Sequence, residues 1–174
     1  MADSQGAVVS DSTPLIYLAK IGRLDLLRDV FEKIHIPEAV LHEAVTQGKA
    51  LNISDAFIIE KAVGAWIIKE QVEPEVDAEL RFLDTNTKLG SGEKEALKLC
   101  KQLNAVHFIA DDREARRVSR ILKIKPIGTI GILIQAFRQD LIAEEALQIL
   151  DDLVKVGFRI SSAVYRRILD ELGT

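Results

Sequence analysis

The chain has 174 residues, a length typical of one domain. Hydrophobic residues make up 48% of it and charged residues 29%, a balance that excludes an intrinsically disordered protein. The formal net charge of −4 excludes a uniformly basic surface. Any contact with a nucleic acid would therefore depend on a local basic patch.

Cysteine content and hydropathy limit the possible location. A single cysteine, Cys100, excludes an internal disulfide framework and a cysteine-based zinc site. The longest stretch without a charged residue, 126–137, has 12 residues, whereas a membrane-spanning helix needs about 20. The segment 1–6 has neither the basic nor the apolar part of a signal peptide. We therefore expect a cytoplasmic protein with no membrane partner.

Short runs rich in β-branched or aromatic residues predict five strands, at 7–10, 34–36, 66–68, 106–110 and 126–127. Helical patterns follow them at 14–19, 24–31, 37–45, 54–65, 74–83, 93–103, 113–122, from 129, and at 146–154, with a terminal helix capped by Ser161. This alternation predicts an α/β fold in which helices cover both faces of a parallel sheet. We expect a single domain over 1–174, with C-terminal helices at about 143–172 that pack on it or form a dimer surface.

Two acidic positions directly follow predicted strands. Asp11 ends the first strand, and either Asp111 or Asp112 ends the fourth. In an open parallel sheet, binding sites form beyond the carboxyl ends of the strands, near the point where the strand order reverses. We therefore expect these carboxylates to lie close together although about 100 residues separate them.

Two more acids lie on predicted helices. Glu93 is about 45° from the centre of its helix's apolar stripe, which points it inward, whereas Glu95 is about 115° away and points outward. Glu43 is about 60° from Val40, at the margin of an apolar stripe, so it faces either the sheet edge or solvent.

Clustered carboxylates repel one another unless a hard cation neutralises them, and Mg²⁺ or Mn²⁺ prefers such oxygen ligands. Bound there, the ion can activate water and polarise a phosphodiester. Each acid also has a purely structural interpretation: Asp11 and the Asp111–Asp112 pair as helix caps, Glu93 as a first-turn acid, and Glu43 as a solvated flank.

Six segments carry a resemblance to a known family, and they run in order over nearly the whole chain: 11–19, 36–43, 89–96, 108–116, 128–133 and 157–161. In these segments the sequence resembles the PIN-domain nucleases, in particular a VapC-like subgroup. The resemblance implies a three-layer α/β/α sandwich and metal-dependent cleavage of single-stranded RNA. It also implies a homodimer and, for a toxin, a cognate antitoxin.

The resemblance assigns site residues as well. The family's acidic positions correspond to Asp11, Glu43, Glu93 and either Asp111 or Asp112. A Thr-X-Asp pattern, common in the family, corresponds to Asp112, whereas the subgroup's pattern corresponds to Asp111; here Ala110 occupies the threonine position. We favour Asp111 as a metal ligand with Asp11 and Glu93, and keep Asp112 as the second choice. By the same resemblance, Ser12 corresponds to the small hydroxyl that orients the first acid.

A basic stripe follows the aspartates. Arg113, Arg116, Arg117 and Arg120 fall within about 100° of arc on one helix. Arginine suits bidentate phosphate contact, so the stripe predicts binding of RNA or of an acidic peptide. The alternative is a solvated face neutralised by neighbouring acids such as Glu114.

The leading hypothesis is a metal-dependent ribonuclease with Asp11, Glu43, Glu93 and Asp111 at its centre, using Mg²⁺ or Mn²⁺. The alternative is a PIN-fold module that binds RNA or protein with weak or no catalysis. A receiver-like phosphoacceptor is disfavoured, because the first strand supplies only one aspartate and Lys125 precedes rather than follows the last strand's Pro126.

Overall fold

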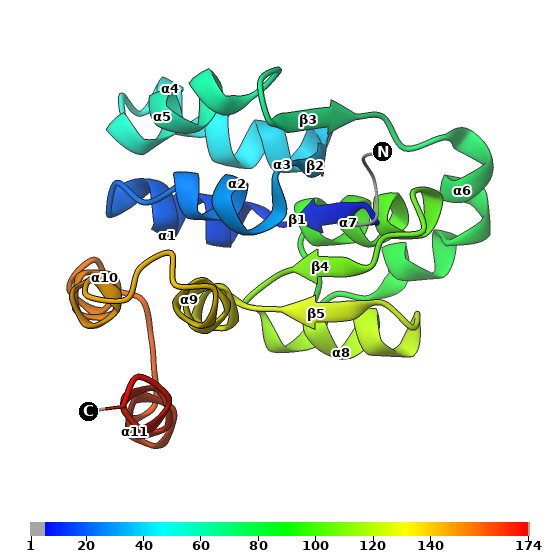
Figure 1. Ribbon diagram of the computed structural model, residues 1–174. Helices are drawn as coiled ribbons and strands as arrows, with labels where there is room; N and C mark the ends of the chain where they lie inside the picture. Colours follow the sequence, from blue (N-terminus) through cyan, green and yellow to red (C-terminus); the bar gives the residue numbers. More distant parts are fainter. Residues whose placement is uncertain (1–5, 174) are drawn as a thin grey trace, which may run out of the picture.

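A parallel five-stranded sheet forms the centre of the protein. The computed structural model describes residues 6–173, so the segment 1–5, on which part of the signal-peptide argument rests, lies outside the described residues. The strand order is β3-β2-β1-β4-β5, and every neighbouring pair is parallel (Figure 1). The strands are β1 Val8–Ser10, β2 Ile34–Pro37, β3 Ile67–Glu70, β4 His107–Ile109 and β5 Lys125–Ile127. All five predicted strands are confirmed to within two residues at either end.

Helices fill the connections. Those before β4 are α1 Ser12–Lys20, α2 Asp25–Phe31, α3 Glu38–Leu41, the π-helical turn η1 His42–Thr46, α4 Gln47–Ala50, α5 Ser54–Ala62, α6 Pro74–Glu79, the 3₁₀ helix η2 Arg81–Thr85 and α7 Ser91–Gln102. Those after β4 are α8 Arg113–Ile121, α9 Thr129–Arg138, α10 Ala146–Lys155 and α11 Ser162–Glu171.

The two faces of the sheet carry different helices. On one face α7 lies against β1, β2 and β4, and α8 lies against β5 and α7. On the other, α2 lies against β2 and α9. The expected three-layer α/β/α arrangement is therefore confirmed. This arrangement arises because the strands are buried and apolar, and amphipathic helices cover both faces of the sheet with their apolar sides.

Several predicted helices have different boundaries; for example, the helix expected at 54–65 ends at Ala62, and the one expected at 93–103 begins at Ser91. The first begins at Ser12, before Pro14. The helix expected at 37–45 continues to Ala50 and contains the π-helical turn η1. The helix expected at 74–83 ends at Glu79 and is followed by η2. The π-helical turn has functional interest because it contains Glu43, and such turns are frequent at functional sites.

The strand order reverses between β1 and β4. From β1, the chain builds β2 and β3 on one side, then crosses to the other side for β4 and β5. The carboxyl ends of β1 and β4 are directly joined, because the Asp11 amide donates to the Ile109 carbonyl at 2.9 Å. This is the switch point at which open α/β sheets place their sites.

The C-terminal helices extend one end of the molecule, opposite α6 (Figure 1). Helix α10 contacts α9 and buries Ile149, Leu150 and Leu153. Helix α11 buries only Ile168, and Ser161 caps it as predicted, accepting from the Val164 amide at 3.2 Å. Helix α10 thus contacts α9, and the single domain with C-terminal helices that pack on it or form a dimer surface stays a prediction. Among the described helices, none has both the length and the hydrophobicity to cross a membrane.

Candidate active site

Asp11 is the innermost acid at the switch point. It directly precedes α1, yet its side chain makes no capping hydrogen bond, so the helix-cap interpretation is wrong. Only 3% of the residue is exposed, and its Oδ1 atom has no hydrogen-bond partner among the described residues. Burial raises the pKa of Asp11 to about 7, with smaller contributions from Glu93, Glu43 and Asp111, while the Ser12 amide opposes the shift.

Glu43 reaches the same place from the π-helical turn. Its Oε2 accepts from the Ser12 hydroxyl at 2.8 Å, and its Oε1 accepts from the Ser91 hydroxyl at 3.1 Å and the Gly92 amide at 3.0 Å. The open choice between sheet edge and solvent is therefore decided for the sheet edge. The Ser12 hydroxyl donates to Glu43, not to Asp11.

Gly92 is required by this contact. A Cβ atom on it would lie 2.6 Å from Glu43 Oε2 and 2.9 Å from Oε1, closer than real side-chain carbons approach an oxygen. The absence of a side chain therefore lets the start of α7 approach the Glu43 carboxylate.

Glu93 is half-buried in the first turn of α7. Its Oε2 accepts from the Gly90 amide at 2.8 Å, so it does stabilise the start of the helix. Burial raises its pKa, as do the charges of Asp112 and Glu43, against the effect of the Gly90 amide. Glu95, predicted to point outward, is instead half-buried and accepts from the Ala39 amide at 3.0 Å.

Asp111 and Asp112 have different surroundings. Asp112 is exposed and caps α8 by accepting from the Ala115 amide at 2.9 Å, as its structural interpretation predicts. Asp111 is half-buried and accepts from the Thr129 amide at 2.8 Å and hydroxyl at 2.6 Å. Burial raises the pKa of Asp111, against the lowering effects of Thr129 and of the Arg116 charge. Of the two aspartates, Asp111 is the one whose negative charge contributes to the raised pKa of Asp11.

The carboxylates converge but are held by hydrogen bonds to the protein. As they are placed, no three acidic, histidine or cysteine side chains within residues 6–173 form a group that could hold one metal ion. The donor set nevertheless fits a hard cation: it consists of carboxylate oxygens, one of them buried without a partner. Burial raises the pKa values of Asp11, Glu93 and Asp111, so each carboxylate is less stable in its ionised form here than in water.

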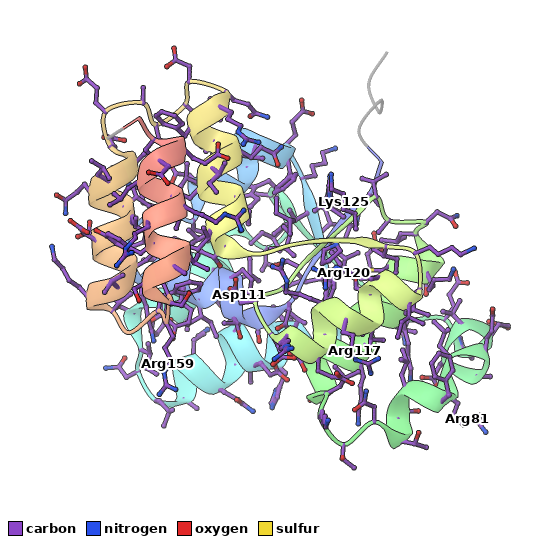
Figure 2. All side chains as sticks on the ribbon, turned by 90° about the horizontal axis from the view of Figure 1, so that it is seen from below. Arg81, Asp111, Arg117, Arg120, Lys125 and Arg159 are labelled. Atoms are coloured by element: carbon purple, nitrogen blue, oxygen red, sulfur yellow. The ribbon has the colours of Figure 1, made fainter. Side chains whose placement is uncertain are left out.

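The predicted arginine stripe divides into three environments. Arg116 donates to the Ala110 carbonyl at 3.3 Å and lies beside Asp111. Arg117 is paired with Glu114 through two hydrogen bonds of 2.8 Å. Arg113 and Arg120 are exposed. Figure 2 shows Arg117 and Arg120 on α8, to one side of Asp111. Arg116 is the arginine of the stripe whose charge acts on Asp111.

Several neighbours of the acids were missed by sequence reasoning. They are Ser91 and Gly92 beside Glu43, and Gly128 and Thr129 beside Asp111. A Cβ on Gly128 would lie 2.5 Å from Arg116 Nη1 and 2.9 Å from Asp111 Oδ1. The sequence did contain a signal for these positions, which is a glycine next to a hydroxyl residue at the start of a helix. Ser91 and Gly92 begin α7, and Gly128 and Thr129 begin α9.

Comparison with known proteins gives one extensive match. A family model described as a PIN domain matches residues 7–174. No curated protein matches the chain. Among solved structures, the fold is similar to that of VapC20 from Mycobacterium tuberculosis, a toxin that cleaves the sarcin-ricin loop. That likeness has 12% identity and a TM-score of 0.49 over 64% of this chain and 95% of VapC20. It is too weak to carry an argument, so any assignment rests on the match over 7–174.

Proposed function

We propose, because the chain belongs to the PIN-domain family, that it is a divalent-metal-dependent endoribonuclease acting on single-stranded RNA. The observation that carries the proposal is the unpartnered Oδ1 of Asp11, buried beside Glu43, Glu93 and Asp111. A buried charge without a partner is costly, and a divalent cation would remove that cost.

The residues divide by their contacts. Asp11, Glu93 and Asp111 would hold Mg²⁺ or Mn²⁺, with Asp112 as the second choice for the last position. A divalent metal bound there would supply the polarisation of the phosphodiester, the activation of water and the stabilisation of the leaving oxygen. Glu43 assists as a carboxylate whose orientation beside the other acids is fixed by three donors.

The positions of Asp11 and Asp111 are set by different means. Asp11 is fixed by the end of β1, since its amide joins β4. Asp111 is fixed by two donors from Thr129 at the start of α9. Arg116, beside Asp111, can contact a phosphate oxygen as the substrate approaches the acids. Roles in substrate binding for Ser12, Arg113, Arg117 and Arg120 remain part of the proposal.

The test compares two aspartate-to-asparagine variants. Unstructured RNA is incubated with Mn²⁺ and wild type, Asp11→Asn or Asp140→Asn. Asp140 follows α9, whose ten residues place it about 15 Å along the helix from the acids, and its φ of 60° suits asparagine. We expect Asp11→Asn to lower cleavage by roughly a hundredfold or more and Asp140→Asn to have no effect. Equal cleavage by all three proteins would refute the proposal.

A PIN-fold binding module without catalysis is the second candidate. It is favoured by the hydrogen bonds that already engage Glu43, Glu93 and Asp111, and by the lack of a group among the described residues that could hold one ion. Calorimetric titration with Mn²⁺ separates the two. Binding that disappears in Asp11→Asn supports the nuclease, and negligible binding supports the module.

The same proposal includes a cytoplasmic location, a homodimer and, if the protein is a toxin, an antitoxin partner. Light scattering after size exclusion measures the oligomeric state directly. For the antitoxin, the test is a small protein encoded next to this chain, which must copurify with it and suppress RNA cleavage.

A further inference from the structure

A pocket of 470 Å³ lies between β5, α9 and α11, beside the acids. Ile130 and Ile134 of α9 form one apolar wall, and Val164 and Ile168 of α11 form the other. Pockets for small ligands have volumes of about 300–1,000 Å³ with mostly apolar walls and a few polar groups. The pocket has the size and composition of a small-ligand site.

The way α11 is attached leaves this space open. Ile168 is the one residue of the helix that is fully buried, and near its end Glu171 pairs with Arg138 of α9 at 2.6 Å. Gly131 of α9 also lines the pocket, and a Cβ there would lie 2.9 Å from Ile127 of β5. Gly131 therefore allows α9 to pack closely on β5, and the gap itself results from the few buried contacts of α11.

Arg167 gives the pocket a cation that can bind an anion. Two arginines, Arg116 and Arg167, and two acids, Asp111 and Glu171, line the pocket. Arg116 lies beside Asp111, whereas Arg167 is exposed with no ion-pair partner in the described part of the chain. The acid Glu171 is already paired with Arg138, so it does not neutralise Arg167. A ligand with an apolar or planar body and a phosphate group matches both the walls and the charge.

The pocket is continuous with the proposed catalytic centre. Asp111 and Gly128 line it, and Asp111 is one of the acids grouped around Asp11. Figure 2 shows Asp111 between the start of α8 and the C-terminal helices. If an RNA strand is bound with one phosphodiester at the acids, a neighbouring nucleotide of that strand would lie at the mouth of the pocket.

We infer that the pocket between α9 and α11 binds one nucleotide of the substrate RNA, next to the phosphodiester that is cleaved. The base inserts between the isoleucines of α9 and Val164 of α11, and its phosphate contacts Arg116 and Arg167. Because the walls are aliphatic and lack an aromatic side chain, the fit of the base depends on shape, so α11 helps to determine which base is accepted. The position beside the cleaved bond rests on the proposed function, whereas nucleotide binding does not.

Binding is tested without catalysis. Labelled single-stranded RNA of mixed sequence is titrated with Asp11→Asn protein in EDTA, alone or with Arg167→Ala or Arg166→Ala added. Arg166 is the matched control, because it is exposed on α11 and lines a different pocket, with Phe158. We expect Arg167→Ala to weaken binding about tenfold and to lower the slope of log Kd against log salt by about 0.7, and Arg166→Ala to change neither.

A second variant tests the pocket by volume. Val164→Trp places a large side chain at its wall, whereas Val154→Trp does so on α10, outside the pocket; both valines are exposed, at 38% and 45%. We expect only Val164→Trp to weaken RNA binding and, in the active protein with Mn²⁺, to alter the base preference next to the cleaved bond. Thermal unfolding of each variant shows that the fold is retained.

The outcomes separate the two proposals. If wild type cleaves RNA but Arg167→Ala and Val164→Trp behave as their controls, the pocket inference is wrong and the nuclease stands. If no protein cleaves RNA but binding still depends on Arg167 and Val164, the pocket stands and the nuclease proposal is wrong. If only free mononucleotides bind in a manner that depends on Arg167, and RNA does not, the pocket does not serve the substrate and the inference is wrong.

Discussion

Replacing Asp11 by asparagine should stabilise the protein in the absence of divalent metal. Asp11 is 3% exposed and Oδ1 has no partner, so its ionised form is unfavourable in the fold. The folded state therefore retains a proton on Asp11 at pH values where the unfolded chain has lost it. As the pH rises from 3.8 to about 7, the wild type loses stability, and a neutral asparagine does not.

The magnitude follows from the two pKa values. An ordinary pKa of 3.8 against about 7 in the fold corresponds to about 4 kcal/mol of destabilisation once both states are ionised. Between pH 5 and pH 8, the part of this loss that develops is about 3 kcal/mol. The buried amide of asparagine has its own desolvation cost of about 1–3 kcal/mol, but this does not vary with pH. The two proteins differ in free energy of unfolding, and the way this difference changes with pH therefore reports only the carboxylate charge.

Urea unfolding of both proteins in EDTA at pH 5, 6, 7 and 8 measures this difference. The free energy of unfolding of Asp11→Asn minus that of the wild type should increase by about 3 kcal/mol from pH 5 to pH 8. Saturating Mn²⁺ at pH 8 should reverse the order, because an ion bound to the native state stabilises only the protein that binds it. A difference that stays constant from pH 5 to pH 8 would contradict the electrostatic reasoning.

Three further predictions concern the surroundings of the acids and the core. Gly92→Ala should abolish most RNA cleavage, because the added carbon would stand 2.6 Å from Glu43 Oε2; cleavage rates with Mn²⁺ measure it. Thr129→Val removes the hydroxyl that donates to Asp111 at 2.6 Å and should weaken Mn²⁺ binding about tenfold by calorimetry. Burial raises the pKa of the Cys100 thiol, so it should react with a thiol reagent at pH 8 only after unfolding.

The two substitutions have matched controls. Gly90→Ala adds the same carbon 3.8 Å from the nearest atom, an ordinary contact, and should retain cleavage. Thr85→Val removes an exposed hydroxyl that donates to Phe82 and should leave Mn²⁺ affinity unchanged. Loss of cleavage in Gly90→Ala equal to that in Gly92→Ala, or rapid modification of Cys100 in native protein, would show that the respective reasoning is wrong.

The layers of the fold could be predicted from the sequence because their causes are local. Runs such as 106–110 form strands since they are β-branched and apolar, and stripes such as that of α7 form helices that bury one side. Strand ends are equally local features, so the sequence located Asp11 and Asp111 at the sheet edge. Direction along a regular helix followed from periodicity only in part: Glu93 is half-buried as expected, but Glu95, expected to point outward, is half-buried too.

Tertiary structure alone decided what those acids contact. Glu43 lies on a π-helical turn, where ideal periodicity no longer gives the direction of a side chain. Its donor Ser91 is 48 residues away, and Thr129 is 18 residues from Asp111. The pocket beside α11 likewise depends on how few contacts that helix makes with α9. Sequence periodicity predicts which side of a helix or strand is apolar, because that depends on neighbouring residues. Contacts between residues far apart in the sequence form only when the whole chain packs.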